Sequence, residues 1–126
     1  METSFWMRGM AEAGGASRSV DDLDWNPHPA FYGVALKHLM DQNGTGGSLS
    51  LHLVRVDPGC TLEPHTHPEQ DELHLVLEGA GQGLLENSAL DYRPGTARFL
   101  PKGQEHSVRA GEGGLLLAAL FTPAGR

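Results

Sequence analysis

Short stretches of alternating apolar and polar residues recur along the chain, a pattern typical of β-strands with one buried face. In residues 48–56 the even-numbered positions, including His52, share one face, and the odd-numbered positions, including Arg55, share the other. Turn-forming residues such as Asp57-Pro58-Gly59 bound these stretches. The pattern predicts strands over residues 31–40, 48–56, 62–67, 72–77, 82–86, 96–100, 106–110 and 115–121.

Glycine and proline are abundant, which favours many turns between short strands. The chain holds 17 glycines and 8 prolines in 126 residues, about a fifth of its length against roughly 12% in average usage. No long stretch has helical periodicity, and residues 41–47 have the composition of a loop. Seven or eight short strands joined in this way predict an all-β fold, either a sandwich or a closed barrel.

The chain has the length of one domain, so a second catalytic domain is not expected. Residues 1–22 are rich in Gly, Ala and Ser without a periodic apolar face, which predicts a flexible N-terminal arm. An alternative is that Phe5, Trp6 and Met7 dock on a neighbouring subunit. Residues 23–126 then form the folded domain, in which order begins near Trp25.

Charge and composition exclude several classes of partner. The net charge is −7, which disfavours binding to nucleic acid and to anionic membrane surfaces. No stretch approaches 18 consecutive apolar residues, so a membrane span is not expected. Cys60 is the only cysteine, which excludes an intrachain disulfide and fits a reducing compartment. We therefore expect a cytoplasmic protein that binds a small molecule.

Histidines gather in two short segments together with a glutamate, and this clustering indicates a metal site. His65 and His67 are two positions apart, so in a strand their imidazoles point the same way, about 6.7 Å apart. Glu72 follows after a gap long enough to turn the chain, and His106 begins a later predicted strand. Three imidazoles and one carboxylate suit a divalent first-row metal with open positions for water or substrate.

Two motifs resemble those of the cupin family, and in particular those of small single-domain bacterial cupins. The first family motif, G-x5-H-x-H-x4-E-x6-G, is matched at every position, by Gly59, His65, His67, Glu72 and Gly79. The second, G-x5-P-x-G-x2-H-x3-N, is matched by Gly95, Pro101, Gly103 and His106, with Ala110 in place of the final Asn. The resemblance implies a double-stranded β-helix, or jelly-roll barrel, whose interior metal is held by His65, His67, Glu72 and His106.

The resemblance leaves the metal and the reaction open. The ion can be Fe, Mn, Ni, Co or Zn. With iron, the site would suit a dioxygenase-type oxidoreductase acting on a small organic molecule, which is our first hypothesis. The alternatives are a non-catalytic module that binds or senses a sugar or organic acid through its metal, and a Lewis-acid isomerase or lyase. Because cupins generally dimerise, we also expect a homodimer.

Two further histidines are candidate catalytic residues. Alternation places His74 on the same face as Glu72, where it can act as a general acid or base, or instead pack and shape the pocket. His52 and Arg55 lie on opposite faces of their strand, so at most one of them lines the cavity. An inward His52 would supply an acid–base group, whereas an inward Arg55 would suit an anionic substrate. His28 and His38 have no partner at a suggestive spacing, and we expect both to be surface or packing residues.

Overall fold

A computed structural model describes residues 5–125 of the chain. Two short 3-10 helices, one short α-helix and ten strands make up its regular structure. In chain order they are η1 (Phe5–Arg8), β1 (Met10–Ala13), β2 (Ala16–Ser19), η2 (Val20–Asp22), β3 (Asn26–Pro27), β4 (Val34–Met40), α1 (Gln42–Thr45), β5 (Ser50–Val56), β6 (Thr61–His65), β7 (Asp71–Leu85), β8 (Ser88–Tyr92), β9 (Ala97–Leu100) and β10 (His106–Thr122). The fold is the all-β jelly-roll barrel that the sequence predicts.

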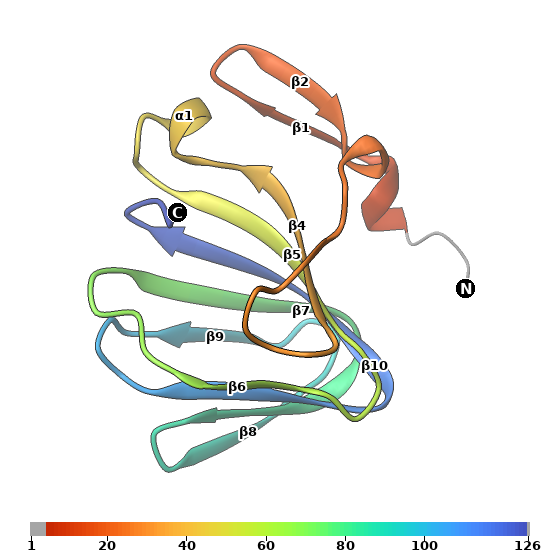
Figure 1. Ribbon diagram of the computed structural model, residues 1–126, viewed down its shortest axis with the longest axis vertical. Helices are drawn as coiled ribbons and strands as arrows, with labels where there is room; N and C mark the ends of the chain where they lie inside the picture. Colours follow the sequence, from red (N-terminus) through yellow and green to blue (C-terminus); the bar gives the residue numbers. More distant parts are fainter. Residues whose placement is uncertain (1–4, 126) are drawn as a thin grey trace.

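Two long strands, β7 and β10, tie the two layers of the barrel together (Figure 1). The N-terminal half of β7 and the C-terminal half of β10 pair with each other and form the first layer together with β5, β4 and β9. Their other halves also pair with each other, and there β10 pairs with β6 and β7 pairs with β8. The sequence analysis predicted separate strands over residues 72–77 and 82–86, and over 106–110 and 115–121. The structure joins each pair into one bent strand, β7 and β10.

Glycines at the bends allow each long strand to change layers. Gly79 has a φ of 83° and Gly114 a φ of 82°, in the left-handed region that favours glycine. A Cβ on Gly79 would collide with the carbonyl oxygen of Gly114. The two strands therefore cross closely at this corner because neither position carries a side chain.

The core lies between the two layers and is apolar away from the mouth. Val54, Val56, Val76, Leu117 and others form one buried cluster. Along β5 the even-numbered residues point inward, as the alternation predicts. The polar residues of this inner face, including His52 and Glu72, lie nearer the end of the barrel where β6 joins β7, drawn on the left in Figure 1.

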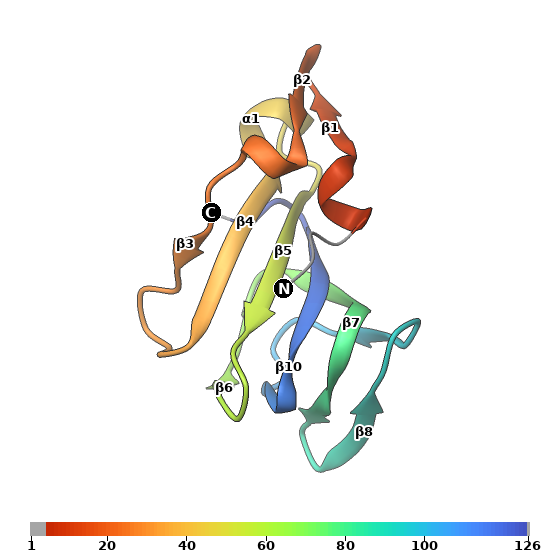
Figure 2. The same cartoon turned by 90° about the vertical axis from the view of Figure 1, so that its right-hand side faces the viewer.

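The N-terminal segment has more structure than its composition predicts. β1 and β2 form a hairpin that lies above β4 in Figures 1 and 2. Ala11 and Val20 are buried against Leu53, Leu77 and Leu116 on the outer face of the sheet. The sequence analysis expected a flexible arm because it could not show that this outer face is apolar and offers the segment a partner. Residues 1–4 of the expected arm lie outside the described residues.

Smaller differences concern short elements. The loop predicted over residues 41–47 contains α1, whose N-terminus is capped by the Asp41 carboxylate. β8 was not predicted, because four of its five residues are exposed and show no alternation. Within residues 5–125, none of the helices has the length and apolar character needed to cross a bilayer.

Candidate metal centre

The four residues of the predicted metal site come together at the mouth of the barrel. His65 ends β6, His67 follows in the next loop, Glu72 is the second residue of β7, and His106 begins β10. Both connections that carry them, β6–β7 and β9–β10, lie at the same end of the barrel (Figure 1). His106 is also paired in register with His65, so two of the four side chains are placed by strand pairing itself.

The donor atoms of these four residues lie close enough to bind one ion. One ligand atom from each residue can be chosen so that all four lie within 4.8 Å of one another. Glu72 Oε1 is 3.1 Å from His106 Nε2 and 3.5 Å from His67 Nε2. Donors around one ion at metal–ligand distances of about 2 Å have separations of this order.

Backbone carbonyls hold two of the imidazoles in the tautomer that a metal requires. His65 Nδ1 lies 2.7 Å from the carbonyl oxygen of Glu63, and His106 Nδ1 lies 3.2 Å from that of Gln104. A carbonyl only accepts, so each Nδ1 carries the proton and donates it. Each Nε2 is then left with a free lone pair, as in metal-bound histidines whose second nitrogen is hydrogen-bonded.

Two buried polar atoms at the centre have no hydrogen-bond partner. They are Glu72 Oε1 and His106 Nε2, whose 3.1 Å contact does not have hydrogen-bond geometry. Both atoms are acceptors once His106 carries its proton on Nδ1, so their lone pairs face each other at a cost in energy. A cation bound by both would remove this cost. The residues therefore fit a divalent metal ion.

The electrostatics of the site keep its ligands in metal-binding form. Burial alone would raise the pKa of Glu72, but the hydrogen bond from His74 helps to outweigh it and hold this pKa well below its usual range. Burial lowers the pKa values of His65 and His67. The carboxylate is therefore ionised and these two imidazoles are neutral at pH 7, as metal ligation requires.

His74 supports Glu72 from behind rather than facing the pocket. Its Nε2 lies 2.8 Å from Glu72 Oε2, and its Nδ1 lies 2.8 Å from the hydroxyl oxygen of Tyr92. The ionised carboxylate can only accept, so His74 donates through Nε2 and accepts at Nδ1 from Tyr92. Both ring nitrogens of His74 are bonded and its side chain is 1% exposed. In this arrangement neither nitrogen is free to exchange a proton with a molecule in the pocket, and the side chain positions Glu72.

The structure decides which of His52 and Arg55 lines the cavity, a choice that the sequence left open. His52 faces inward and is buried, whereas Arg55 faces outward, 4.6 Å from the centroid of the Trp25 ring. A pocket of roughly 340 Å³ lies beside the metal centre, and its walls include His52, His67, Gln70, Phe121 and Gly125. His52 is therefore a titratable side chain of the pocket wall, which it shares with the proposed ligand His67.

Two neighbours of the site were not found by the sequence analysis. Tyr92 lies on the unpredicted strand β8, and burial raises its pKa to about 12, so its hydroxyl keeps its proton. His38 lies on β4 directly across from His52, with the two Nδ1 atoms 2.9 Å apart. Neither has a sequence spacing to the motifs that would mark it, since both are placed by strand register.

A jelly-roll barrel with three histidines and a glutamate converging at its mouth defines a class of metal-binding β-barrel proteins. The family model described as "Cupin domain" matches residues 52–120, which is more than half of the chain. The chain belongs to the cupin family. The fold and the family inferred from the two motifs are thereby confirmed.

One similar protein of known name is a lyase. The chain is 34% identical over 85 residues to dimethylsulfoniopropionate lyase DddW from Ruegeria pomeroyi, a match that covers 65% of this chain and 55% of that protein. The chain spans about half the length of the curated relatives it matches.

Solved structures give the same fold. KdgF from Halomonas sp. has a TM-score of 0.73 and 28% identity, with 83% of this chain and 92% of that chain covered. A protein from Thermotoga maritima described as a predicted oxalate decarboxylase has a TM-score of 0.76 at 18% identity, with 82% and 95% covered. The second likeness concerns the fold alone.

Proposed function

We propose that this cupin is a metal-dependent lyase that acts on a small organic acid. The observation that carries the proposal is the convergence of His65, His67, Glu72 and His106 on one point beside a pocket whose wall holds His52. The similarity to dimethylsulfoniopropionate lyase DddW supports elimination chemistry. An elimination breaks the bond to the leaving group, removes a proton from the adjacent carbon and forms a double bond.

The chain's own residues supply the parts that such a reaction needs. Three imidazoles and the Glu72 carboxylate would hold the ion, which when bound supplies Lewis-acid polarisation of a substrate oxygen. Burial lowers the pKa of His52 to about 4, so its imidazole is neutral at pH 7 and able to accept a proton. Phe121 lies between His52 and His67 as an apolar surface, and Gln70 adds an amide to the pocket wall.

A dioxygenase-type oxidoreductase is the second candidate. Its support is the donor set itself, because three neutral imidazoles and a carboxylate also suit Fe(II) with open positions for oxygen and an organic chelate. A non-catalytic sensing module for a sugar or organic acid is the third candidate, and it would use the same ligands without His52.

Oxygen dependence separates these candidates. The protein would be loaded in turn with Fe(II), Mn, Co, Ni or Zn and incubated with dimethylsulfoniopropionate, other 3-substituted propionates, diketones, thiols and catechols, with and without oxygen. Alkene formation without oxygen supports the lyase, and turnover coupled to oxygen uptake supports the dioxygenase. Metal-dependent binding without turnover supports the sensing module. His106→Ala serves as the metal-free control.

We also propose that two copies of the chain associate through the outer face of the first layer, at the end near the mouth. Leu73, Leu75 and Phe99 are exposed there on β7 and β9, and Leu73 is paired in register with Phe99. A patch of this kind on a sheet face is typical of a protein interface. The cytoplasmic location expected from the single cysteine stays a prediction.

A further inference from the structure

We propose that His38 and His52 form a proton relay that connects the pocket beside the metal centre with solvent. The relay rests on the proposed function, because only a reaction that moves protons would use it. The sequence analysis expected His38 to be a surface or packing residue, so the relay gives this residue a role in catalysis.

The contact between the two rings has the geometry of a hydrogen bond. His38 and His52 are register partners on β4 and β5, so their side chains leave the sheet on the same face. Their Nδ1 atoms are 2.9 Å apart, and the rings meet edge to face with centroids 4.7 Å apart. Two nitrogens at this distance share one proton, since two lone pairs or two N–H groups would repel.

The inner end of the relay lies at the pocket. His52 is buried and lines the pocket together with His67, and both rings pack against Phe121. Because His52 Nδ1 is bonded to His38, Nε2 is the nitrogen left for a molecule in the pocket. A substrate proton would therefore be taken or returned at His52 Nε2.

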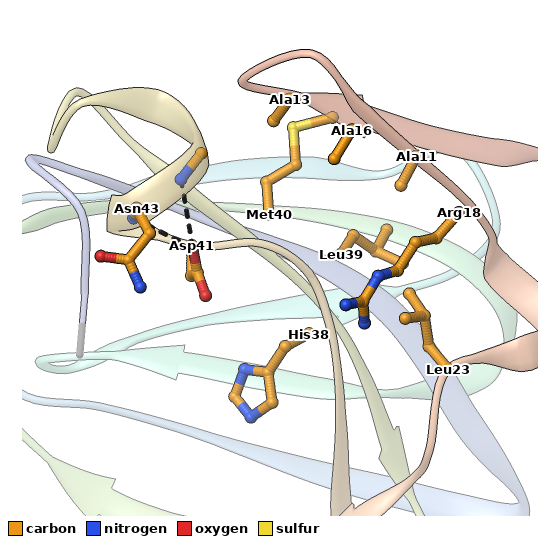
Figure 3. Close-up of a pocket in the computed structure, with 11 residues that line it drawn as sticks. Ala11, Ala13, Ala16, Arg18, Leu23, His38, Leu39, Met40, Asp41 and Asn43 are labelled. Carbon is orange, nitrogen blue, oxygen red and sulfur yellow. Dashed lines mark hydrogen bonds between the residues drawn. The ribbon is translucent and has the colours of Figure 1, made fainter.

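The outer end of the relay lies at the protein surface. His38 is exposed, and although it borders a second pocket, of roughly 310 Å³, between the β1–β2 hairpin and β4, its ring does not point into that pocket. Figure 3 shows its ring directed away from Ala11, Ala13 and Ala16 of the hairpin. Its Nδ1 is bonded to His52, so Nε2 is the nitrogen left to exchange protons with water.

Proton movement through the pair balances without any other reactant. In the starting state His52 Nδ1 donates to His38 Nδ1, and His38 carries a proton on Nε2. A proton accepted at His52 Nε2 drives the Nδ1 proton across to His38, which then releases its Nε2 proton to water. One proton enters and one leaves, and both rings end neutral.

The end state differs from the starting state in which nitrogen of each ring carries the proton. His52 now holds a proton on Nε2, facing the pocket, and accepts at Nδ1 from His38. It can return that proton to a molecule in the pocket while His38 passes its Nδ1 proton back to His52 and takes a proton from water at Nε2, which restores the starting state. Burial disfavours a positive charge on the His52 ring, beside the pocket.

Nuclear magnetic resonance tests the relay without a substrate. In zinc-loaded, ¹⁵N-histidine-labelled protein at pH 7, we expect a coupling between the two Nδ1 nuclei transmitted through the shared hydrogen bond. The coupling should vanish in His38→Ala and persist in His28→Ala, a control that removes a histidine outside the pair. Absence of the coupling in the wild-type protein would overturn the relay.

Kinetics test whether the hydrogen bond carries protons. With whichever acid of the panel is turned over, His38→Ala should slow turnover at least about tenfold, and imidazole added to the buffer should restore the rate. Unchanged turnover, or a loss that imidazole does not restore, would overturn the relay. If the wild-type protein turns over no compound, the proposed lyase and dioxygenase both fail, and the coupling between the Nδ1 nuclei alone decides the relay.

Discussion

The first layer, which contains β4, β5 and β9, has polar residues on its inner face and apolar residues on its outer face near the mouth. Most barrels have the reverse arrangement. Along β7 the inward residues Glu72 and His74 are polar and almost fully buried, whereas the outward residues Leu73 and Leu75 are apolar and about 40% exposed. On β9, outward-facing Phe99 is 56% exposed. Polar groups inside and apolar groups outside both cost free energy in an isolated chain. The proposed cation on the inside and the proposed second copy of the chain on the outside would each remove one of these costs.

Part of the same outer face is covered by another segment of the chain. Its other end, around Leu53, Leu77 and Leu116, is covered by the N-terminal segment and is buried. At the mouth end no described segment covers Leu73 and Phe99. The contrast between the faces can be tested by disturbing one face at a time.

The largest effect should come from removing a metal ligand on the inner face. His106→Ala leaves Glu72 with one fewer imidazole to share the ion, so affinity for Zn or Mn should fall more than about 100-fold. Isothermal titration calorimetry measures the change, and His28→Ala is the matched control. Metal content at the wild-type level would contradict the assignment of His106.

Acidification should destabilise the metal-free protein through the buried histidines. The folded-state pKa of His52, about 4, lies below its ordinary value of 6.5, so the unfolded chain binds more protons between these values. Stability is therefore present above pH 6.5 and is lost as the pH falls toward 4, by roughly 2 kcal/mol for His52 after allowing for partial solvent screening.

Urea unfolding at several pH values measures this dependence. His52→Gln should flatten the slope between pH 6.5 and pH 4, because its amide does not titrate. The lowered pKa values of His65 and His67 act in the same direction and leave part of the slope in the variant. An identical slope in His52→Gln and the wild type would contradict the burial of a neutral His52.

A charge on the outer face should separate the proposed dimer without touching the metal centre. Phe99→Glu places a carboxylate in an apolar interface, which should weaken association about 30-fold, equivalent to about 2 kcal/mol of lost apolar burial. Light scattering over a concentration series measures it, with the exposed Tyr32→Glu as control. A wild-type monomer at micromolar concentration would refute the dimer.

The smallest effect should come from the support behind Glu72. Tyr92→Phe removes the hydroxyl that donates to His74 Nδ1, so the imidazole loses one of the two bonds that orient it. Metal affinity should fall about tenfold, at the low end for residues that orient ligands. Tyr32→Phe, at an exposed tyrosine, should leave the affinity unchanged. Equal affinity in both variants would mean that Tyr92 does not position Glu72.

Local spacing explains how much of the site could be predicted. His65, His67 and Glu72 lie within eight residues, and His106 lies in a second compact motif, so their convergence could be inferred from the motifs. The alternation of residues 48–56 left either His52 or Arg55 to face the cavity, and the structure places His52 inside. Each glycine of the two motifs, Gly59, Gly79, Gly95 and Gly103, has a positive φ, a conformation that favours glycine, so these motif positions reflect the backbone of the fold.

Interactions that depend on register could not be predicted. The His38–His52 pair requires the alignment of β4 with β5, and Tyr92 requires a strand whose exposed residues show no pattern. The order in the N-terminal segment depends on an apolar outer face that one chain segment cannot reveal by itself. In each case the missing information was the position of a distant partner.

Pairing of His106 with His65 across β10 and β6 has a consequence for how this scaffold can change. Backbone pairing fixes the spacing of these two residues, whereas the 86–105 segment that separates β7 from β10 acts on the site through Gln104, whose carbonyl oxygen accepts from His106 Nδ1, and through Tyr92, which contacts His74. That segment can be lengthened, shortened or exchanged at its exposed turns while the two imidazoles keep their spacing. Changes in these turns can therefore alter what enters the mouth while the pairing that aligns the two histidines is kept.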